Sequence, residues 1–419
     1  MNCRETQEQQ EQQEQIHIAR QPIFDMQRQV YGYELLFRRT LQNTYDGTDP
    51  DQATLDVVTN SFLLFGIESL TRGKLAFINF TANNLLTKLP AMLPREQVAV
   101  EILEDVKPDE EVLRRCSELK SAGYMLVLDD FVYKKERLPL VELADIVKID
   151  FRATSAAERQ QWQDFLTPYD LRLLAEKVET EEEFQEARAA GYTYVQGYYF
   201  SKPALVSGNA LPACKANHFK LLQEFSRSDL EFGQIEAVLR KDVSLSYNLL
   251  KFINSALFGF RQPIRSLHQA MVLLGHKELS KWGALVALKD MGVDKPGELI
   301  LSSLVRARFG EQLAMHCVGK ICTADAFLLG LFSHLDALLD RPLADILSEI
   351  PVKEEIKRAF NEEAEGVLSL LYNLMQKYEQ GQWQSAAAYA QKIELSEGQV
   401  LLGYREALNW AQDVFTGNY

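Results

Sequence analysis

The chain has 419 residues, of which 47% are hydrophobic and 25% charged, and its formal net charge is −14. This length allows two domains with separate cores, and the acidic balance argues against non-specific binding to nucleic acid or anionic membranes. No uninterrupted apolar run reaches the roughly 18 residues of a membrane span, there is no signal-peptide pattern, and five scattered cysteines form no framework. We therefore expect a cytoplasmic protein without a membrane span.

The predicted organisation begins with a leader rich in Gln and Glu, residues 1–15, which lacks apolar spacing and is expected to be disordered. Residues 17–203 alternate strand-like and helix-like segments. Prolines, a glycine and small residues then indicate a linker at 205–214. Helical spacing dominates residues 215–419. The pattern predicts an α/β domain followed by an all-α domain with a C-terminal helical extension.

Six short apolar runs in the first half of the chain each end in an acid, an amide or a lysine. They cover residues 76–79, 98–101, 125–130, 146–148, 173–176 and 194–196. Apolar runs of this length, separated by helix-like stretches, predict strands buried on both faces of a parallel sheet. In a closed α/β barrel the catalytic groups lie at the carboxyl ends of the strands. The polar ends of the runs are therefore expected to surround one mouth of a TIM-like barrel.

Several of these polar residues offer hard oxygen ligands, which suit Mg²⁺ or Mn²⁺ better than zinc. The expected metal ligands are Glu34, Asn79, Glu101 and Asp129. Asp130 would be a bridging ligand if two metals bind, and two metals about 4 Å apart can clamp a phosphodiester for in-line attack by water. Crowded carboxylates repel one another unless cations hold them, so the ring implies a divalent-metal site.

Other polar residues of the same set have side chains suited to catalysis. Lys148 carries a point charge that could steady a phosphate or a metal-bound hydroxide. Glu176 could take a proton from the attacking water, and Gln196 could orient that water. Arg38 lies four residues after Glu34 and could form a forked contact with a phosphate. Taken singly, each residue is more often a solvated loop start, but the ordered set favours a functional site.

The order of these motifs resembles that of the EAL family, barrel enzymes that hydrolyse the bacterial second messenger cyclic di-GMP. The matching segments are Gln21-Pro22-Ile23, Glu34-Leu35-Leu36-Phe37-Arg38, Asn79, Glu101-Ile102-Leu103-Glu104, Asp129-Asp130-Phe131, Lys148-Ile149-Asp150, Ala175-Glu176-Lys177-Val178-Glu179, and Gln196-Gly197-Tyr198 with Pro203. The resemblance spans residues 16–204 and implies an EAL-type barrel there. It implies metal binding by Glu34, Asn79, Glu101, Asp129 and Asp130. It implies catalytic roles for Lys148, Glu176 and Gln196, and dinucleotide binding by Gln21, Leu36, Arg38 and Pro203.

The loop after Asp-Asp-Phe departs from the family pattern. The family has Gly-Thr-Gly-Tyr-Ser, a flexible loop that ties substrate binding to metal binding, whereas this chain has Val132-Tyr133-Lys134-Lys135-Glu136. The glycines that permit unusual backbone angles are absent, and Glu104, which would anchor the loop, lacks its serine partner. Lys177 in place of glycine and Leu35 in place of alanine are lesser changes. The ligand set favours hydrolysis, whereas the changed loop favours weak or absent turnover.

The helical half carries a second resemblance, over about residues 230–290, to the HDOD domain. This domain is a helical relative of the HD phosphohydrolases that is usually considered non-catalytic. None of the six histidines is followed directly by Asp, so no HD-type metal site is expected. Gly275 is predicted to end a helix, and Asn254 to pin a helix junction.

Together, the two resemblances imply a bacterial cyclic di-GMP signalling protein of EAL–HDOD type. The first hypothesis is a metal-dependent phosphodiesterase that produces linear pGpG and carries a helical regulatory domain. The second is a catalytically inactive EAL-like effector that binds cyclic di-GMP or a protein partner. A pure scaffold is the third. The resemblance also implies a protein partner for the helical half and a homodimer.

Overall fold

The computed structural model describes residues 17–38, 67–197, 213–227, 232–241, 243–254, 262–292, 295–317, 321–361 and 364–416. The chain divides into two compact units, which comprise residues 1–202 with 376–387, and residues 203–375 with 388–419. Three predicted features lie outside the described residues: the leader at 1–15, positions 205–212 of the linker, and Pro203.

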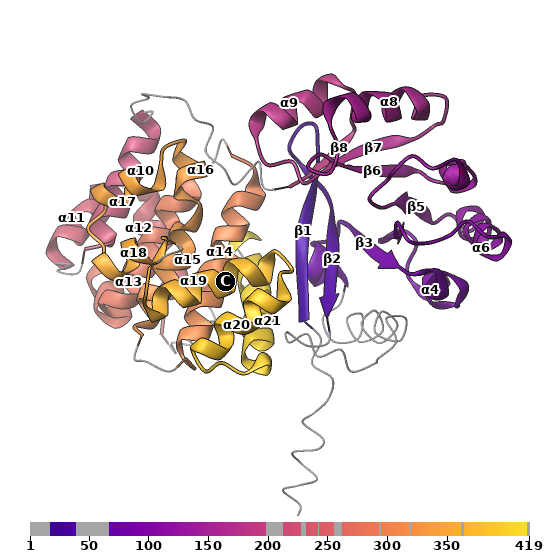
Figure 1. Cartoon of the computed structure of the whole chain (residues 1–419). Coiled ribbons are helices and arrows are strands. Elements are labelled where there is room, and N and C mark those ends of the chain that lie inside the picture. Colours follow the sequence, from indigo (N-terminus) through magenta and orange to yellow (C-terminus); the bar gives the residue numbers. More distant parts are fainter. Residues whose placement is uncertain are drawn as a thin grey trace, which may run out of the picture. The chain divides into compact units, whose positions relative to one another are not determined.

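The first unit contains a closed barrel of eight strands in sequence order (Figure 1). The strands are β1 (His17–Asp25), β2 (Val30–Arg38), β3 (Leu75–Phe80), β4 (Val98–Ile102), β5 (Met125–Leu128), β6 (Ile146–Asp150), β7 (Arg172–Glu176) and β8 (Tyr194–Gln196). Strand β1 is antiparallel to both β2 and β8, and the pairs from β2–β3 to β7–β8 are parallel. The predicted α/β barrel is confirmed, and the six apolar runs are strands β3 to β8.

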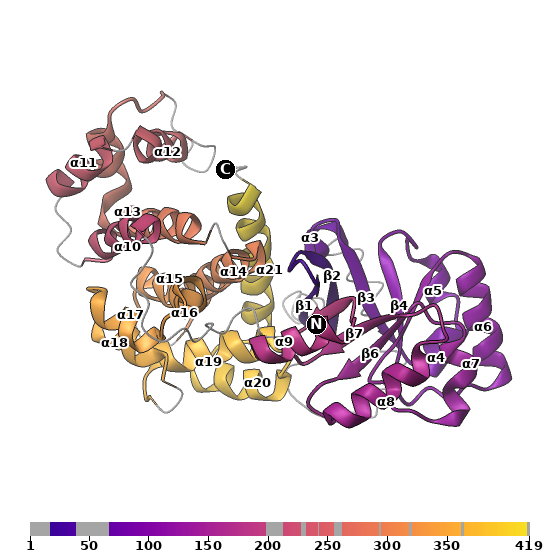
Figure 2. The same ribbon diagram turned by 90° about the horizontal axis from the view of Figure 1, so that it is seen from above.

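Helices connect the strands on the outer side of the barrel. They are α3 (Ile67–Thr71), α4 (Ala82–Leu86), α5 (Leu89–Met92), α6 (Glu110–Ser121), the 3₁₀ turn η1 (Lys135–Arg137), α7 (Leu138–Val141), α8 (Ala156–Leu166) and α9 (Glu181–Ala189). Figure 2 shows α4 to α8 outside the strands. Helices α8 and α9 start where the sequence provides a capping box, Ser155 with Glu158 and Thr180 with Glu183.

One layer of apolar side chains fills the barrel below the candidate site. Its members are Ile23, Phe77, Ala99, Val127, Ile146, Leu174 and Tyr194. Successive side chains of a strand point to opposite faces, so the residue two positions further along faces the same interior. Six of these positions are followed, two residues later, by Asn79, Glu101, Asp129, Lys148, Glu176 and Gln196. The apolar layer therefore supports a polar layer at the carboxyl ends of the parallel strands.

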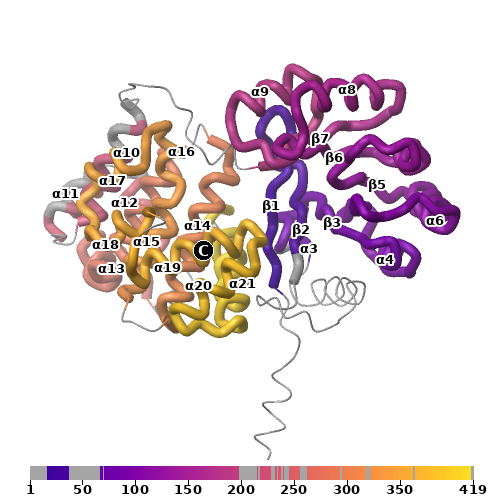
Figure 3. Tube along the Cα trace, in the orientation of Figure 1, coloured from indigo at the N-terminus to yellow at the C-terminus, as the bar shows by residue number. Residues whose placement is uncertain are grey.

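The second unit is helical, and Figure 3 traces its chain. The helices that follow the barrel are α10 (Ala213–Phe225), α11 (Phe232–Lys241), α12 (Val243–Ile253), α13 (Leu267–Met291), α14 (Gly297–Ala314), α15 (Thr323–Leu331), η3 (Phe332–His334), α16 (Leu335–Leu339), α17 (Leu343–Glu349), α18 (Glu354–Ala359), α19 (Val367–Glu379), α20 (Trp383–Lys392) and α21 (Glu397–Thr416). The described part of residues 213–416 contains no strand, which confirms the all-α prediction.

Two local predictions for the helical unit are confirmed. Helix α13 is interrupted at Gly275, whose φ of 69° and ψ of 174° are not helical. The side chain of Asn254 joins α12 to the segment before α13, because its Nδ2 donates to the carbonyl oxygen of Ile264 at 2.7 Å and its Oδ1 accepts from the Ile264 amide at 2.7 Å. None of the described helices is long and apolar enough to cross a lipid bilayer.

Candidate functional site

The polar layer at the barrel mouth brings together predicted site residues from seven strands and one loop. Strands β3, β4, β6, β7 and β8 and the loop after β5 contribute six polar residues, and the antiparallel pair β1–β2 adds Gln21 and Glu34. Strand pairing places Asn79 beside Glu101 and Gln21 beside Glu34. Asn79, Glu101 and Lys148 lie inside their strands rather than at the ends that the sequence suggested.

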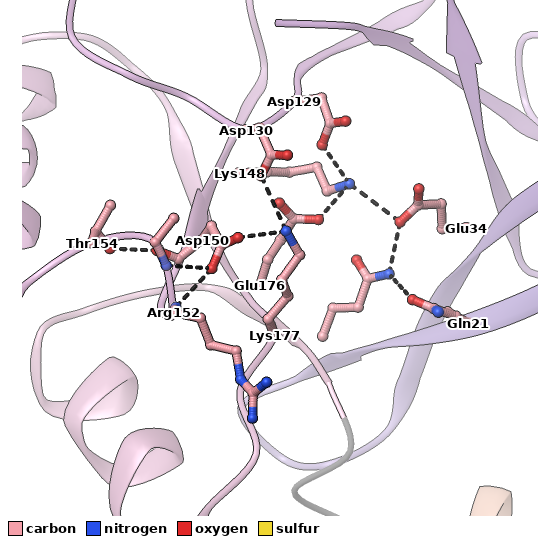
Figure 4. Close-up of polar contacts among 12 residues, drawn as sticks. Gln21, Glu34, Asp129, Asp130, Lys148, Asp150, Arg152, Thr154, Glu176 and Lys177 are labelled. Carbon is pink, nitrogen blue, oxygen red and sulfur yellow. Dashed lines mark hydrogen bonds and ion pairs between the residues drawn. The ribbon is translucent and has the colours of Figure 1, made fainter. Parts of the chain in front are cut away.

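The ammonium group of Lys148 lies at the centre of four carboxylates. Figure 4 shows three of them, those of Glu34, Asp129 and Glu176. Its Nζ is 2.7 Å from Glu176 Oε1, 2.8 Å from Asp129 Oδ1 and 3.3 Å from Glu34 Oε2, and it also contacts Glu101. The Lys148 and Glu101 side chains are completely buried. Buried charges are costly unless opposite charges compensate them. Here a single cation faces four acids, so it cannot compensate them all if each is ionised.

Two amides orient the carboxylate of Glu34. The Nδ2 of Asn79 donates to Glu34 Oε1 at 3.1 Å, and the Nε2 of Gln196 donates to Glu34 Oε2 at 2.7 Å and to Gln21 Oε1 at 3.2 Å. Because each amide donates to Glu34, its carbonyl oxygen is left available to accept or to coordinate.

The pKa values of the cluster reflect both burial and the central cation. Burial raises the pKa of Glu101 well above its usual range and that of Glu176 to about 8, although Lys148 opposes both shifts. Burial acts the same way on Asp129, but attraction and hydrogen bonding by Lys148 outweigh it and lower the pKa of that carboxyl. Burial disfavours the charged form of Lys148, yet the surrounding acids raise its pKa. Lys148 therefore stays charged, and the cluster must retain protons or gain a further cation.

The unsatisfied atoms of the cluster indicate which kind of group it fits. Among the described residues, five buried acceptor oxygens of the cluster have no hydrogen-bond partner: Asn79 Oδ1, Glu101 Oε2, Asp130 Oδ1, Glu176 Oε2 and Gln196 Oε1. An unsatisfied buried polar atom costs about 1–3 kcal/mol. In addition, one oxygen each of Glu104, Asp129 and Asp130 lie within 4.8 Å of one another. Oxygen acceptors in this number fit a hard divalent cation.

A second ion pair, between the exposed Lys177 and the buried Asp150, adjoins this cluster. The ammonium of Lys177 contacts the carboxylate of Asp150 and lies 3.8 Å from Asp130 Oδ1 (Figure 4). Asp150 Oδ1 is held by the backbone amides of Arg152 and Ala153 at 2.7 and 3.0 Å. Lys177 has a φ of 55°, in the left-handed region that favours glycine.

Lys177 and Asp150 were not among the predicted site residues. The available signal was a lysine at a position where the EAL pattern has glycine, directly after Glu176. What this lysine contacts depends on its left-handed backbone conformation. That conformation directs the side chain toward Asp150 and Asp130, which lie 27 and 47 residues earlier in the chain.

A cavity of about 420 Å³ opens at the polar layer. Its walls include Gln21, Leu36, Glu176 and Gln196, so two of the predicted dinucleotide-binding residues lie at the site. The side chain of Arg38 and the whole of Pro203 are outside the described residues. The individual roles predicted for all site residues remain predictions.

Comparison with known proteins identifies the family of this chain. The EAL domain model matches residues 65–203, and the HDOD domain model matches residues 211–365. The uncharacterized protein YuxH of Bacillus subtilis (strain 168) is 37% identical over 407 residues, which cover 95% of this chain and 98% of YuxH. The chain belongs to the EAL–HDOD family.

A second relative of this EAL–HDOD protein is the cyclic di-GMP phosphodiesterase CdgJ of Vibrio cholerae serotype O1. It is 35% identical over 401 residues, which cover 95% of this chain and 93% of CdgJ. Among solved structures, the EAL-domain protein YkuI of Bacillus subtilis, in complex with cyclic di-GMP and calcium, is 22% identical, with a TM-score of 0.37, and the match covers 44% of this chain and 53% of YkuI.

The loop that departs from the EAL pattern is held by a buried side chain at each end. Phe131 is buried edge-on against Trp162, with ring centroids 6.0 Å apart, and its amide donates to the Lys148 carbonyl at 2.9 Å. At the other end, η1 places the buried guanidinium of Arg137 where Glu104 and Asp129 attract it, and its Nη2 donates to the Leu103 carbonyl at 3.3 Å. An arginine therefore takes part in holding the loop beside Glu104.

Proposed function

We propose that this EAL–HDOD protein is a metal-dependent phosphodiesterase that hydrolyses cyclic di-GMP to linear pGpG. The observation that carries the proposal is the buried ring of acceptor oxygens around Lys148. The near-full-length similarity to CdgJ, a cyclic di-GMP phosphodiesterase, supports the choice of substrate. In this proposal the helical unit regulates the barrel or recruits a protein partner, and a homodimer is a further expectation from the family.

The metal in this proposal is Mg²⁺ or Mn²⁺. Glu34, Asn79, Glu101 and Asp129 would hold it, with Asp130 as the ligand shared with a second ion. Bound there, a divalent cation supplies charge stabilisation for the phosphoryl group under attack. The fit rests on the chemistry of the donors, which are all carboxylate or amide oxygens.

The side chains of the barrel account for proton transfer, charge stabilisation and binding of the dinucleotide. Glu176 accepts the proton of the attacking water, and its pKa of about 8 makes it a strong enough base to do so near neutral pH. The unpartnered Oε1 of Gln196 accepts a hydrogen bond from that water. Lys148 keeps its positive charge and stabilises the negative charge that builds up nearby. Gln21 and Leu36 contact the dinucleotide from the cavity wall, together with Arg38 and Pro203.

The test is a turnover assay on the purified full-length protein. With Mn²⁺ or Mg²⁺ present, we expect cyclic di-GMP to be converted to pGpG, as resolved by anion-exchange chromatography. Chelation of the metal with EDTA should stop the reaction, and added Mn²⁺ should restore it. Absence of pGpG at every metal concentration, in a protein that still binds cyclic di-GMP by calorimetry, would replace this proposal with the second candidate.

The second candidate is a catalytically inactive effector that binds cyclic di-GMP or a protein partner. The position of Lys177 favours it, because the ammonium group occupies the side of the cluster where Asp130 and Asp150 would otherwise offer free carboxylates. A cation of the protein itself repels a metal ion that approaches the same acids. The changed loop after Phe131 also favours this candidate.

Replacing Lys177 with glycine tests whether its charge limits metal binding, as the second candidate supposes. We expect the Lys177→Gly variant to bind Mn²⁺ more tightly at Asp130, by about tenfold or more, because a positive charge close to that site is removed. The free Mn²⁺ signal in electron paramagnetic resonance titrations measures both the affinity and the number of bound ions. Turnover should rise with the additional occupancy.

The Lys177→Met variant is the matched control, since it removes the charge and keeps a side chain at the left-handed position. We expect it to show the same gain in Mn²⁺ affinity. If both variants bind Mn²⁺ like the wild type, Lys177 does not limit metal binding. If only the glycine variant gains affinity, the backbone conformation rather than the charge is responsible.

A further inference from the structure

The helical unit contains a cavity of its own, separate from the barrel site. It has a volume of about 290 Å³ and is lined by α12, α13, α14, α15 and α21. Four aromatic rings form much of its wall: Phe252, Trp282, Phe327 and Trp410. Trp282 and Phe327 are buried, with 5% and 2% of their surface exposed. The cavity therefore offers flat apolar surface inside a folded core.

Each acidic group of this cavity lies beside a basic side chain. The buried carboxylate of Glu311 accepts from Lys281 at 2.6 Å and from Arg308 at 2.7 Å. Lys281 also pairs with Glu278 at 2.6 Å, and Asp290 lies 3.5 Å from the ring of His218. These contacts leave no carboxylate of the lining without a basic neighbour.

The same ion pairs hold two of the rings in place. Lys281 Nζ lies 5.5 Å from the centre of the Phe327 ring, and Arg308 Cζ lies 5.9 Å from the centre of the Trp410 ring. Arg308 reaches α21 as well, through Glu406 at 2.7 Å. The aromatic wall is therefore fixed before any ligand enters, which lowers the entropy cost of binding.

Two lysines of the lining remain without a counter-ion. Lys251 on α12 and Lys289 on α13 are exposed, and neither has an ion-pair partner within the part of the chain that the structure describes. The cavity is lined by four basic and three acidic side chains, in a chain whose net charge is −14. The unpaired positive charge lies at the exposed edge, beside the aromatic wall.

We propose that this cavity binds a small aromatic anion, a molecule of one or two planar rings that carries an acidic group. The rings pack against Trp282, Phe327 and Trp410, and the acidic group meets Lys251 and Lys289. The volume is close to the lower end of ligand pockets, which span roughly 300–1,000 Å³, so a one- or two-ring molecule fits. Ligand binding here would give the helical unit a small-molecule input, whatever the barrel does.

Calorimetry of the full-length protein with three matched probes tests the proposal. Naphthalene-2-sulfonate carries both the rings and the charge, 2-naphthol carries the rings alone, and inorganic phosphate carries the charge alone. We expect the sulfonate to bind at one site per chain, 2-naphthol to bind at least about tenfold more weakly, and phosphate to show no binding at millimolar concentration. EDTA in the buffer keeps the barrel site free of metal, and the result should not change.

Two changes to the cavity assign the binding to it. Leu285→Trp places a large ring into the cavity and should remove binding of both naphthalene probes. The double variant Lys251→Gln/Lys289→Gln alters only exposed side chains and should weaken the sulfonate about tenfold without affecting 2-naphthol. Tyr247→Ala is the control, because Tyr247 is on α12 but is 65% exposed and does not line the cavity.

Several results would overturn the proposal. One is an absence of sulfonate binding to the wild type. Another is sulfonate binding that neither Leu285→Trp nor the lysine double variant reduces. A third is phosphate binding as tight as that of the sulfonate, because it would mean that the site binds anions without any contribution from the aromatic rings. If Leu285→Trp does not fold, the double variant and the comparison of the three probes decide the question without it.

Discussion

Glu176→Gln should remove hydrolysis of cyclic di-GMP while leaving binding of the dinucleotide within a few-fold of wild type. A positioned general base contributes about 10²–10⁴-fold to the rate, so kcat should fall by at least about a hundredfold. Glutamine keeps the size of the side chain and an oxygen for Lys148, which lies 2.7 Å from Glu176 Oε1, but it cannot accept the proton. Steady-state kinetics and calorimetric titration measure the two effects separately.

The pH profile provides a second readout for Glu176. Burial raises the pKa of its carboxyl to about 8, and only the deprotonated form can act as base. The wild-type rate should therefore rise with pH up to about 8, about tenfold per unit on the acid side, and this limb should be missing from any residual activity of Glu176→Gln. Glu182→Gln, an exposed change of the same kind on α9, should leave rate and profile unchanged. A Glu176→Gln variant with more than a tenth of wild-type kcat would assign the base elsewhere.

Lys148→Met should destabilise the barrel more than any exposed lysine change. Removing one partner of a buried ion pair costs about 3–5 kcal/mol, because the remaining charges stay buried without compensation. Here four acids would lose their common cation. Differential scanning calorimetry gives the size of the effect, and hydrogen–deuterium exchange of β6 and β7 should locate it in the barrel.

The pH dependence of the Lys148→Met defect has a definite sign. Without the ammonium, nothing opposes the effect of burial on Glu101 and Glu176, whose folded pKa values already lie above their usual range and should rise further. A group with a raised folded pKa loses stability as pH increases. The defect should therefore be small near pH 4 and large above about pH 8, the value to which burial already raises the pKa of Glu176.

Divalent cations should partly compensate for the missing lysine. We expect Mn²⁺ to raise the melting temperature of Lys148→Met more than that of wild type, because the oxygens that Lys148 held become additional ligands. Lys120→Met is the matched control: Lys120 pairs with Asp145 at 2.6 Å but is more than a third exposed, and its loss should cost less than about 1 kcal/mol. Equal stability of the two variants would mean that Lys148 does not balance the cluster.

The strands that build the site could be predicted from the sequence because their signal is local. Each of β3 to β8 is a short apolar run with a polar residue at a set position, and parallel strands of a barrel bring such positions to one end. The motifs around Glu34 and Gln21 indicated further site residues. The sequence did not indicate that β1 runs antiparallel to both its neighbours, since strand direction in a barrel depends on how the whole sheet closes.

The ion pairs that balance the charges of the site could not be predicted from local sequence patterns. Lys148 was expected to act on substrate, and the structure adds that it is also the counter-ion of four acids. The contact between Lys177 and Asp150 depends on the left-handed backbone conformation of Lys177, which the pattern of apolar and polar residues does not indicate. Likewise, the cavity in the helical unit is lined by residues from five helices that extend from α12 to α21.

The amino-acid sequence by itself determined the two-domain composition of this protein, the barrel strands and the identity of the polar residues at the barrel mouth. These follow from short-range patterns of apolar and polar residues, which set the local structure. Only the tertiary structure decided which side chains share a counter-ion, because interaction energies between charges depend on distance and burial. Those quantities exist only once segments remote in the chain have packed together.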